Sequence, residues 1–161
     1  MKFLGLIVAL VFLPLASATA EEKSILEKFE GTWGSEGDAF GSPAESTMVW
    51  SRALNDKFYR LDYRIEMRPA SGEPQTFEGL AIYRADDDGY YAYWADTSGD
   101  FLPVTAIRDG DALVAHWGET GAKQGRTRYE LIDGDKIEIT DWILTPEGWR
   151  RFNNNVFARA D

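Results

Sequence analysis

Hydrophobic and polar residues alternate with a period of two over most of the chain after residue 45. The clearest run covers residues 59–67, where aromatic and aliphatic residues at odd positions alternate with charged residues at even positions. Such alternation is typical of a β-strand with one buried face. Similar runs predict further strands at 45–54, 76–84, 90–96, 101–108, 112–119, 126–132, 136–145 and 149–159.

A short helix is predicted ahead of these strands. Ser24 and Glu27 have the spacing of a capping box, and three apolar residues between positions 25 and 29 fall on one helical face. Gly31 ends this helix, and Trp33 follows in a first strand. The helix is therefore expected to cover one end of a small barrel whose first strand carries Trp33.

Short turns join the predicted strands, among them the Asp-Gly sequences at 88–89, 109–110 and 133–134. Asp-Gly in a short turn favours a hairpin, so neighbouring strands should be antiparallel. A long meander leaves two exposed edges unless it closes on itself. We therefore predict an all-β fold, a closed antiparallel up-and-down β-barrel of about ten strands with a short N-terminal helix. A β-sandwich is the alternative.

The first twenty residues have the pattern of a secretory signal peptide. Lys2 is their one charged residue, residues 3–15 are apolar, and small residues at 18–20 fit signal peptidase. The alternative is a membrane anchor, but the apolar run is short for a span. We predict a signal peptide at 1–20, a lipocalin-like barrel domain at 21–161, and export to the periplasm or the medium of a bacterium. No membrane span is expected after cleavage.

The charge and composition of the chain limit the kinds of partner that it can bind. The chain has 17 basic and 27 acidic residues, and loss of Lys2 with the signal leaves a net charge of about −11. Such a surface repels phosphate backbones, so nucleic acid is excluded as a partner. The acidic turns lack a complete calcium-loop pattern. The chain has no Cys and one His, so no zinc cluster, metal or cofactor is expected.

Large aromatic rings suggest a ligand cavity inside the barrel. Tyr and Trp combine apolar area with a polar group, which suits a pocket for a partly polar organic molecule. The alternative is that the rings fill a solid core. Arg128, Arg150 and Arg151 lie on late strands. If one of them points inward it could bind a carboxylate, or it could cap the helix or lie over Trp33. The predicted ligand-binding residues are Trp33, Tyr63, Tyr83, Tyr93, Trp94, His116, Arg128 and Arg151, and further lining candidates are Trp50, Tyr59, Tyr91 and Trp117.

No catalytic motif is present, so no catalytic residue is assigned. The pattern leaves the inward face of the strand carrying His116 open. Asn153 to Asn155 form a polar run, and any that point inward would need hydrogen-bond partners. Two alternatives to a binding protein stay open. One is a barrel-type isomerase, cyclase or lyase that uses His116 or a buried Tyr with an Arg. The other is an envelope interaction protein with outward aromatic residues gathered in one patch.

Three segments resemble the lipocalin-like (calycin) superfamily, and more narrowly a group of uncharacterised bacterial lipocalin-like domains. They are the Gly-x-Trp opening at 31–33, the Gly-containing strand at 78–83 and the Tyr-Trp strand at 91–96. The resemblance implies a barrel that carries small hydrophobic or amphipathic molecules. A distant similarity to nitrobindin-type haem barrels does not extend to haem, because the glycine after Trp33 is out of step and residues 149–159 contain no His.

These observations predict an exported barrel that carries or sequesters a small hydrophobic or amphipathic molecule. The identity of that molecule and the oligomeric state are left open by the sequence.

Overall fold

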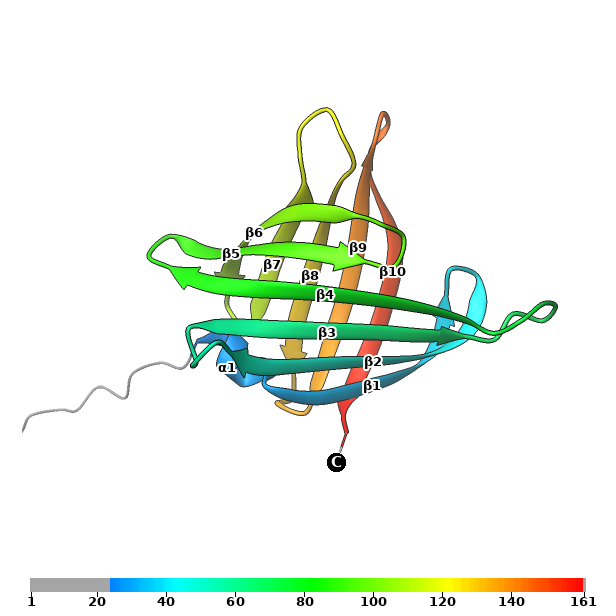
Figure 1. Ribbon diagram of the computed structural model, residues 1–161, viewed down its shortest axis with the longest axis horizontal. Helices are drawn as coiled ribbons and strands as arrows, with labels where there is room; N and C mark the ends of the chain where they lie inside the picture. Colours follow the sequence, from blue (N-terminus) through cyan, green and yellow to red (C-terminus); the bar gives the residue numbers. More distant parts are fainter. Residues whose placement is uncertain (1–23, 161) are drawn as a thin grey trace, which may run out of the picture.

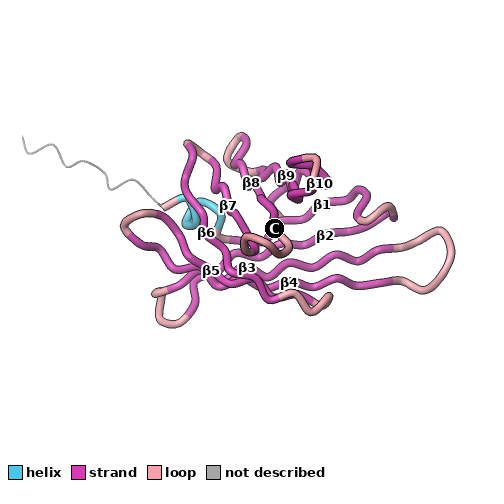
Figure 2. The backbone as a smooth tube through the Cα atoms, turned by 90° about the horizontal axis from the view of Figure 1, so that it is seen from above, coloured by secondary structure: helices cyan, strands magenta, loops and turns pink. Residues whose placement is uncertain are grey.

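Ten antiparallel strands close into a barrel in the computed structural model, which describes residues 24–160 (Figures 1 and 2). The predicted signal peptide lies outside these residues. Each strand pairs with its neighbours in sequence, and the last strand pairs with the first, so the predicted up-and-down barrel is confirmed. The elements are α1 (Ile25–Phe29), β1 (Gly31–Ala39), β2 (Ser42–Ala53), β3 (Phe58–Met67), β4 (Gln75–Asp86), β5 (Gly89–Asp96), β6 (Phe101–Asp109), β7 (Ala112–Gly118), β8 (Gln124–Ile132), β9 (Lys136–Thr145) and β10 (Gly148–Arg159).

The side-chain alternation read from the sequence sets the two faces of the wall. On β3 the odd positions from 59 to 67 face inward, and Leu61 is completely buried. On β7 the sequence left the face open, and the structure puts Leu113 and Ala115 inside with His116 exposed outside. No helix among residues 24–160 has the length and hydrophobicity needed to cross a membrane.

Helix α1 covers one end of the barrel. Its residues Ile25, Leu26 and Phe29 are completely buried, because the apolar face of this single turn has the barrel interior to pack against. The predicted capping box does not form, since the Ser24 hydroxyl makes no cap and instead hydrogen-bonds to the Tyr90 hydroxyl at 2.9 Å. The fold thus stabilises this short helix by packing and by contacts to the strands.

The barrel closes through a short seam between β1 and β10, in which Trp33 pairs with Arg159 and Gly34 with Ala158. The predicted end of the helix at Gly31 is confirmed, since α1 stops at Phe29 and Gly31 begins β1 with a φ of +128°. At this φ a side chain would be strained, so glycine is required for the chain to turn from the helix into the wall.

Arg159 ties the helix to the seam. Its guanidinium lies 4.0 Å from the centre of the Trp33 ring, and its Nη1 donates to the Glu30 carbonyl at 2.8 Å. Trp33 is completely buried, and its indole N–H donates to the Phe29 carbonyl at 2.7 Å. The sequence suggested Arg128, Arg150 or Arg151 for such a position over Trp33, but the arginine that lies there is Arg159, which the sequence did not single out.

Replacing Arg159 with methionine should destabilise the barrel while keeping the apolar stem. The substitution removes a cation–π contact and a hydrogen bond to a helix carbonyl, which together contribute about 1–2 kcal/mol. Urea denaturation followed by circular dichroism measures this loss in the free energy of unfolding. Arg151→Met is the matched control, because Arg151 is an exposed arginine on the same strand. Equal losses in the two variants would contradict the structural role of Arg159.

Candidate functional site

The barrel is packed at the α1 end and hollow at the other. A cavity of about 660 Å³ lies inside the hollow half and reaches the turns that join β1 to β2, β5 to β6 and β7 to β8. Those turns stand at the end opposite α1 (Figure 1). The wall is mostly aromatic and aliphatic and includes Tyr63, Phe77, Trp94, Trp117, Tyr129 and Ile139.

Two glycine–tryptophan pairs make this cavity possible. Trp94 leans over Gly79 on the neighbouring strand, where an added Cβ would lie 2.1 Å from the indole. Trp117 leans over Gly125 in the same way, and there the distance would be 1.8 Å. Because each ring occupies the space of a missing side chain on the wall, neither ring has to project across the barrel. The two glycines therefore help to keep the interior open.

The floor of the cavity is a layer of aromatic rings. Tyr83 and Tyr129 both line the cavity, and Trp50 packs against both, with ring centres 5.3 Å and 5.7 Å away. Phe29 of the helix contacts Trp50 at 5.6 Å. This stack separates the hollow half of the barrel from the packed half and forms the base of the cavity.

The tyrosines of the cavity are held in their neutral form. Burial raises the pKa of Tyr63, Tyr83 and Tyr129 far above the ordinary value, and the charge of Asp141 adds to the rise at Tyr63 and Tyr129. These side chains can donate and accept hydrogen bonds, but they are poor candidates for a phenolate base near neutral pH.

Asp141 is the carboxylate set deepest in the cavity wall, and two chains of neutral donors converge on it. The Thr127 hydroxyl donates to Oδ1 at 2.5 Å, and the Trp117 indole N–H donates to Thr127 at 3.2 Å. The Asn153 amide donates to Oδ2 at 2.7 Å, and the Asn155 amide donates to Asn153 at 2.9 Å. Burial raises the pKa of Asp141, and the bonds from Asn153 and Thr127 oppose that rise.

The other charged groups of the cavity lie nearer its mouth, the open end of the barrel opposite α1. Asp96 accepts from the Trp94 indole N–H at 2.8 Å and from a backbone N–H of the β5–β6 turn at 2.8 Å. Lys123 lines the cavity in an ion pair with Asp100, and Arg150 lines it from an exposed position on β10. The basic groups of the wall are thus confined to the rim.

Three of the predicted ligand-binding residues, Tyr63, Tyr83 and Trp94, line the cavity. Trp33 points into the barrel but is buried in the packed half beside α1. Trp50 and Tyr59, weighed as further candidates, also belong to that core. The predicted aromatic lining is thus divided between a solid core and a hollow site, which are the two arrangements that the sequence left open.

The structure places the other four predicted site residues away from the cavity. Tyr93 is 56% exposed and stacks on Phe101 on the outer wall. His116 is exposed with its ring 6.4 Å from that of Trp149. The other two are Arg128, which pairs with Asp109 and Glu130 across the outer wall, and Arg151, which is exposed beside Trp142 on the strand pair β9–β10.

Sequence reasoning missed the polar residues that distinguish this cavity, above all Asp141 and Thr127. Strict alternation could have found Asp141, because it shares a strand face with Ile137, Ile139 and Ile143. The polar run at 153–155 was noted, and the structure gives Asn153 and Asn155 the inward positions and the partners they need.

Asp141 should make the stability of the barrel depend on pH. Its raised pKa means that the folded state binds a proton more tightly than the unfolded state, so its contribution to stability falls as pH rises above about 4. The free energy of unfolding of Asp141→Asn, minus that of the wild type, should therefore increase between about pH 4 and 7. Urea denaturation at several pH values measures it, with Asp62→Asn on the outer wall as control. A flat difference would contradict the effect of burial on Asp141.

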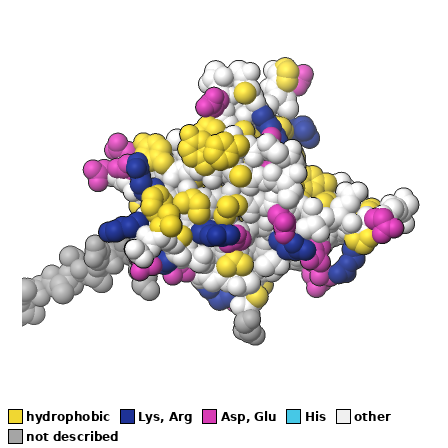
Figure 3. All heavy atoms as spheres, viewed as in Figure 1, with side chains coloured by type: hydrophobic (Ala, Val, Ile, Leu, Met, Phe, Trp, Pro, Cys, Tyr) yellow, Lys and Arg dark blue, Asp and Glu magenta, His cyan; other side chains and the backbone are white. Residues whose placement is uncertain are grey.

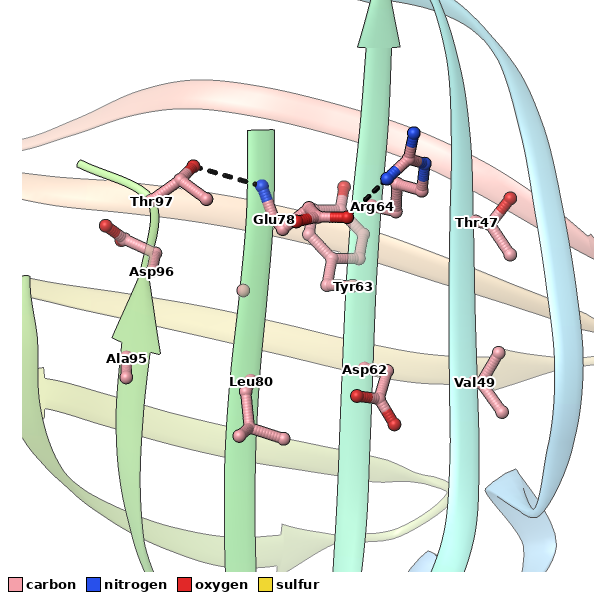
Figure 4. A pocket seen from close by; sticks show the side chains of 11 residues that line it. Thr47, Val49, Asp62, Tyr63, Arg64, Glu78, Leu80, Ala95, Asp96 and Thr97 are labelled. Carbon is pink, nitrogen blue, oxygen red and sulfur yellow. Dashed lines mark hydrogen bonds and ion pairs between the residues drawn. The ribbon is translucent and has the colours of Figure 1, made fainter. Parts of the chain in front are cut away.

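A second depression, of about 590 Å³, lies on the outer wall across β2 to β5 (Figure 4). Val49, Asp62 and Leu80 lie in one row across neighbouring strands. The charged groups of this depression already have partners: Arg64 pairs with Glu78, Asp62 pairs with Arg60, and Asp96 accepts from the Trp94 indole N–H. This groove therefore holds no charge that calls for a ligand.

Apolar side chains also gather on the outer wall over β4, β5 and β6 (Figure 3). Tyr91, Tyr93, Phe101 and Ile107 are each between 46% and 69% exposed. Among residues 24–160, no three His, Cys, Asp or Glu side chains are grouped so that they could hold a metal ion.

The barrel is a closed ten-stranded meander with a helix over one end (Figure 1). It is similar to the solved structure of the S-type phycobiliprotein lyase CPES from Guillardia theta, with a TM-score of 0.54 over 84% of this chain and 90% of that chain. The two sequences are 12% identical, so the likeness concerns the fold alone. No family model and no curated protein matches the chain.

Proposed function

We propose that this protein is an exported barrel that carries or sequesters a small hydrophobic or amphipathic molecule. The observation that carries the proposal is the cavity of about 660 Å³, a volume typical of pockets for small molecules. A barrel whose only task was stability would fill this space with aliphatic side chains, because empty volume costs packing energy.

The lining supports an amphipathic ligand. Aromatic faces from Tyr63, Trp94 and Trp117 offer a large apolar contact area, and Asp141 and Asn153 offer polar atoms in the same cavity. The solved neighbour is named as a phycobiliprotein lyase, which is in keeping with a barrel that handles a small molecule. The proposal transfers neither that reaction nor its substrate.

The alternative that the protein is an enzyme has less support than the binding function. His116 lies outside the barrel, away from the cavity, and the buried tyrosines are held neutral. The interaction alternative rests on the apolar residues of the outer wall, and nothing in the described part of the chain indicates what would cover them. The cavity is the better-supported site.

Blocking the cavity tests the binding function. Val104 is 5% exposed and lines the cavity, whereas its neighbour Thr105 points outward. Val104→Phe should fill part of the cavity and weaken binding of the neutral dye Nile red by about tenfold or more, and Thr105→Phe should leave binding unchanged. Dye fluorescence gives the affinities, and native mass spectrometry of gently purified protein shows whether a molecule is already bound.

Equal dye binding by the two variants would place the dye outside the barrel. Together with mass spectra of an empty wild-type protein, that result would remove the proposed function. Circular dichroism of both variants verifies that the fold is kept.

Export is the part of the proposal that rests on the sequence alone. N-terminal sequencing of the protein recovered from its native host tests it. A mature chain that begins at Glu21 supports cleavage of the signal, and a mature chain that begins at Met1 contradicts it.

A further inference from the structure

The charge balance inside the cavity points to the chemical class of the ligand. Four carboxylates line the cavity, those of Asp38, Asp96, Asp100 and Asp141, against the two basic groups of Lys123 and Arg150. Lys123 is already paired with Asp100, and Arg150 is exposed at the mouth. Asp38 is exposed at the mouth as well, so the excess of negative charge inside the cavity comes from Asp96 and Asp141.

Asp141 is the centre of this excess. Its hydrogen bonds come from a hydroxyl and an amide, both neutral. Neutral donors stabilise a carboxylate by their dipoles, but they do not compensate its charge. A buried carboxylate without a counter-charge is costly, and an oppositely charged ligand group would relieve that cost.

The surrounding rings favour the same kind of ligand group. Tyr and Trp faces attract cations through their ring quadrupole, and the attraction grows when the site excludes water. Tyr63, Trp94, Trp117 and Tyr129 all line the cavity with Asp141. A protonated amine on a ring-containing body would contact both the carboxylate and these faces.

We propose that the ligand is an amphipathic organic cation, whose ring system packs on the aromatic wall and whose protonated amine binds the Asp141 carboxylate. This inference rests on the proposed binding function and adds the class of molecule bound.

An anionic ligand such as a fatty acid fits less well. It would need a basic side chain deep in the cavity, and the two basic residues of the described lining are at the rim. Arg128 and Arg151, the arginines that the sequence suggested for such an anchor, lie on the outer wall. A carboxylate placed beside Asp141 would meet a like charge in a site of low polarity.

Three probes with the same ring test the inference. Naphthylethylamine is cationic at neutral pH, naphthylethanol is neutral and naphthylpropanoate is anionic. Isothermal titration calorimetry of the wild-type protein should give an affinity for the amine about tenfold or more above that for the alcohol, with the propanoate weakest. This order can be measured without any variant.

The variant Asp141→Asn then tests whether the Asp141 carboxylate is the group that favours the amine. The variant keeps the size of the side chain but removes its charge, so the preference for the amine over the alcohol should fall about tenfold while the affinity for the alcohol is kept. Asp62→Asn, which removes a carboxylate from the outer wall, is the matched control and should keep the preference. Circular dichroism of both variants checks folding.

A tighter affinity for the propanoate, or an amine preference that survives Asp141→Asn, overturns the inference. If none of the three probes binds but Nile red still binds inside the barrel, the inference fails and the proposed function stands. If Nile red does not bind inside the barrel either, the inference and the proposed function are both overturned.

Discussion

The contact of Arg159 with Trp33 and the end of α1 is the constraint on which the barrel depends. The ladder between β1 and β10 is short, with two residue pairs and one further backbone hydrogen bond from Ala160 to Thr32, and a β-meander that fails to close exposes two edges. The guanidinium lies over the ring of Trp33 and bonds to the Glu30 carbonyl. One side chain of the last strand therefore holds the first strand and the helix together at the packed end of the barrel.

The fold followed from the sequence because its signals are local. Alternation at 59–67 and the Asp-Gly turns specify strands and hairpins without knowledge of distant residues. Closure could be inferred because a meander of ten strands needs its edges covered. The prediction of a capping box at Ser24 was wrong, because the Ser24 hydroxyl hydrogen-bonds to Tyr90, which is far away in the sequence. Such a competition is decided by tertiary packing.

The site was only partly predictable. Tyr63 and Trp94 could be chosen as large polar rings on strands, but residue type does not tell which end of the barrel a ring occupies, so Trp33 was grouped with them. His116 and Arg128 were chosen for their chemistry on strands whose register was open. Asp141 was passed over because a lone acid in a strand usually faces water, although its isoleucine neighbours mark the inner face.

The tryptophans that lean over Gly79 and Gly125 have a practical consequence for experiments. The chain has six tryptophans, and of these only Trp94 and Trp117 are among the cavity-lining residues. Their indole N–H groups are tied to Asp96 and Thr127, which fixes both rings in the cavity wall, where a molecule placed in the barrel would change the polarity around them. The protein thus carries its own optical reporter of occupancy, and its ultraviolet emission can be followed without an attached label.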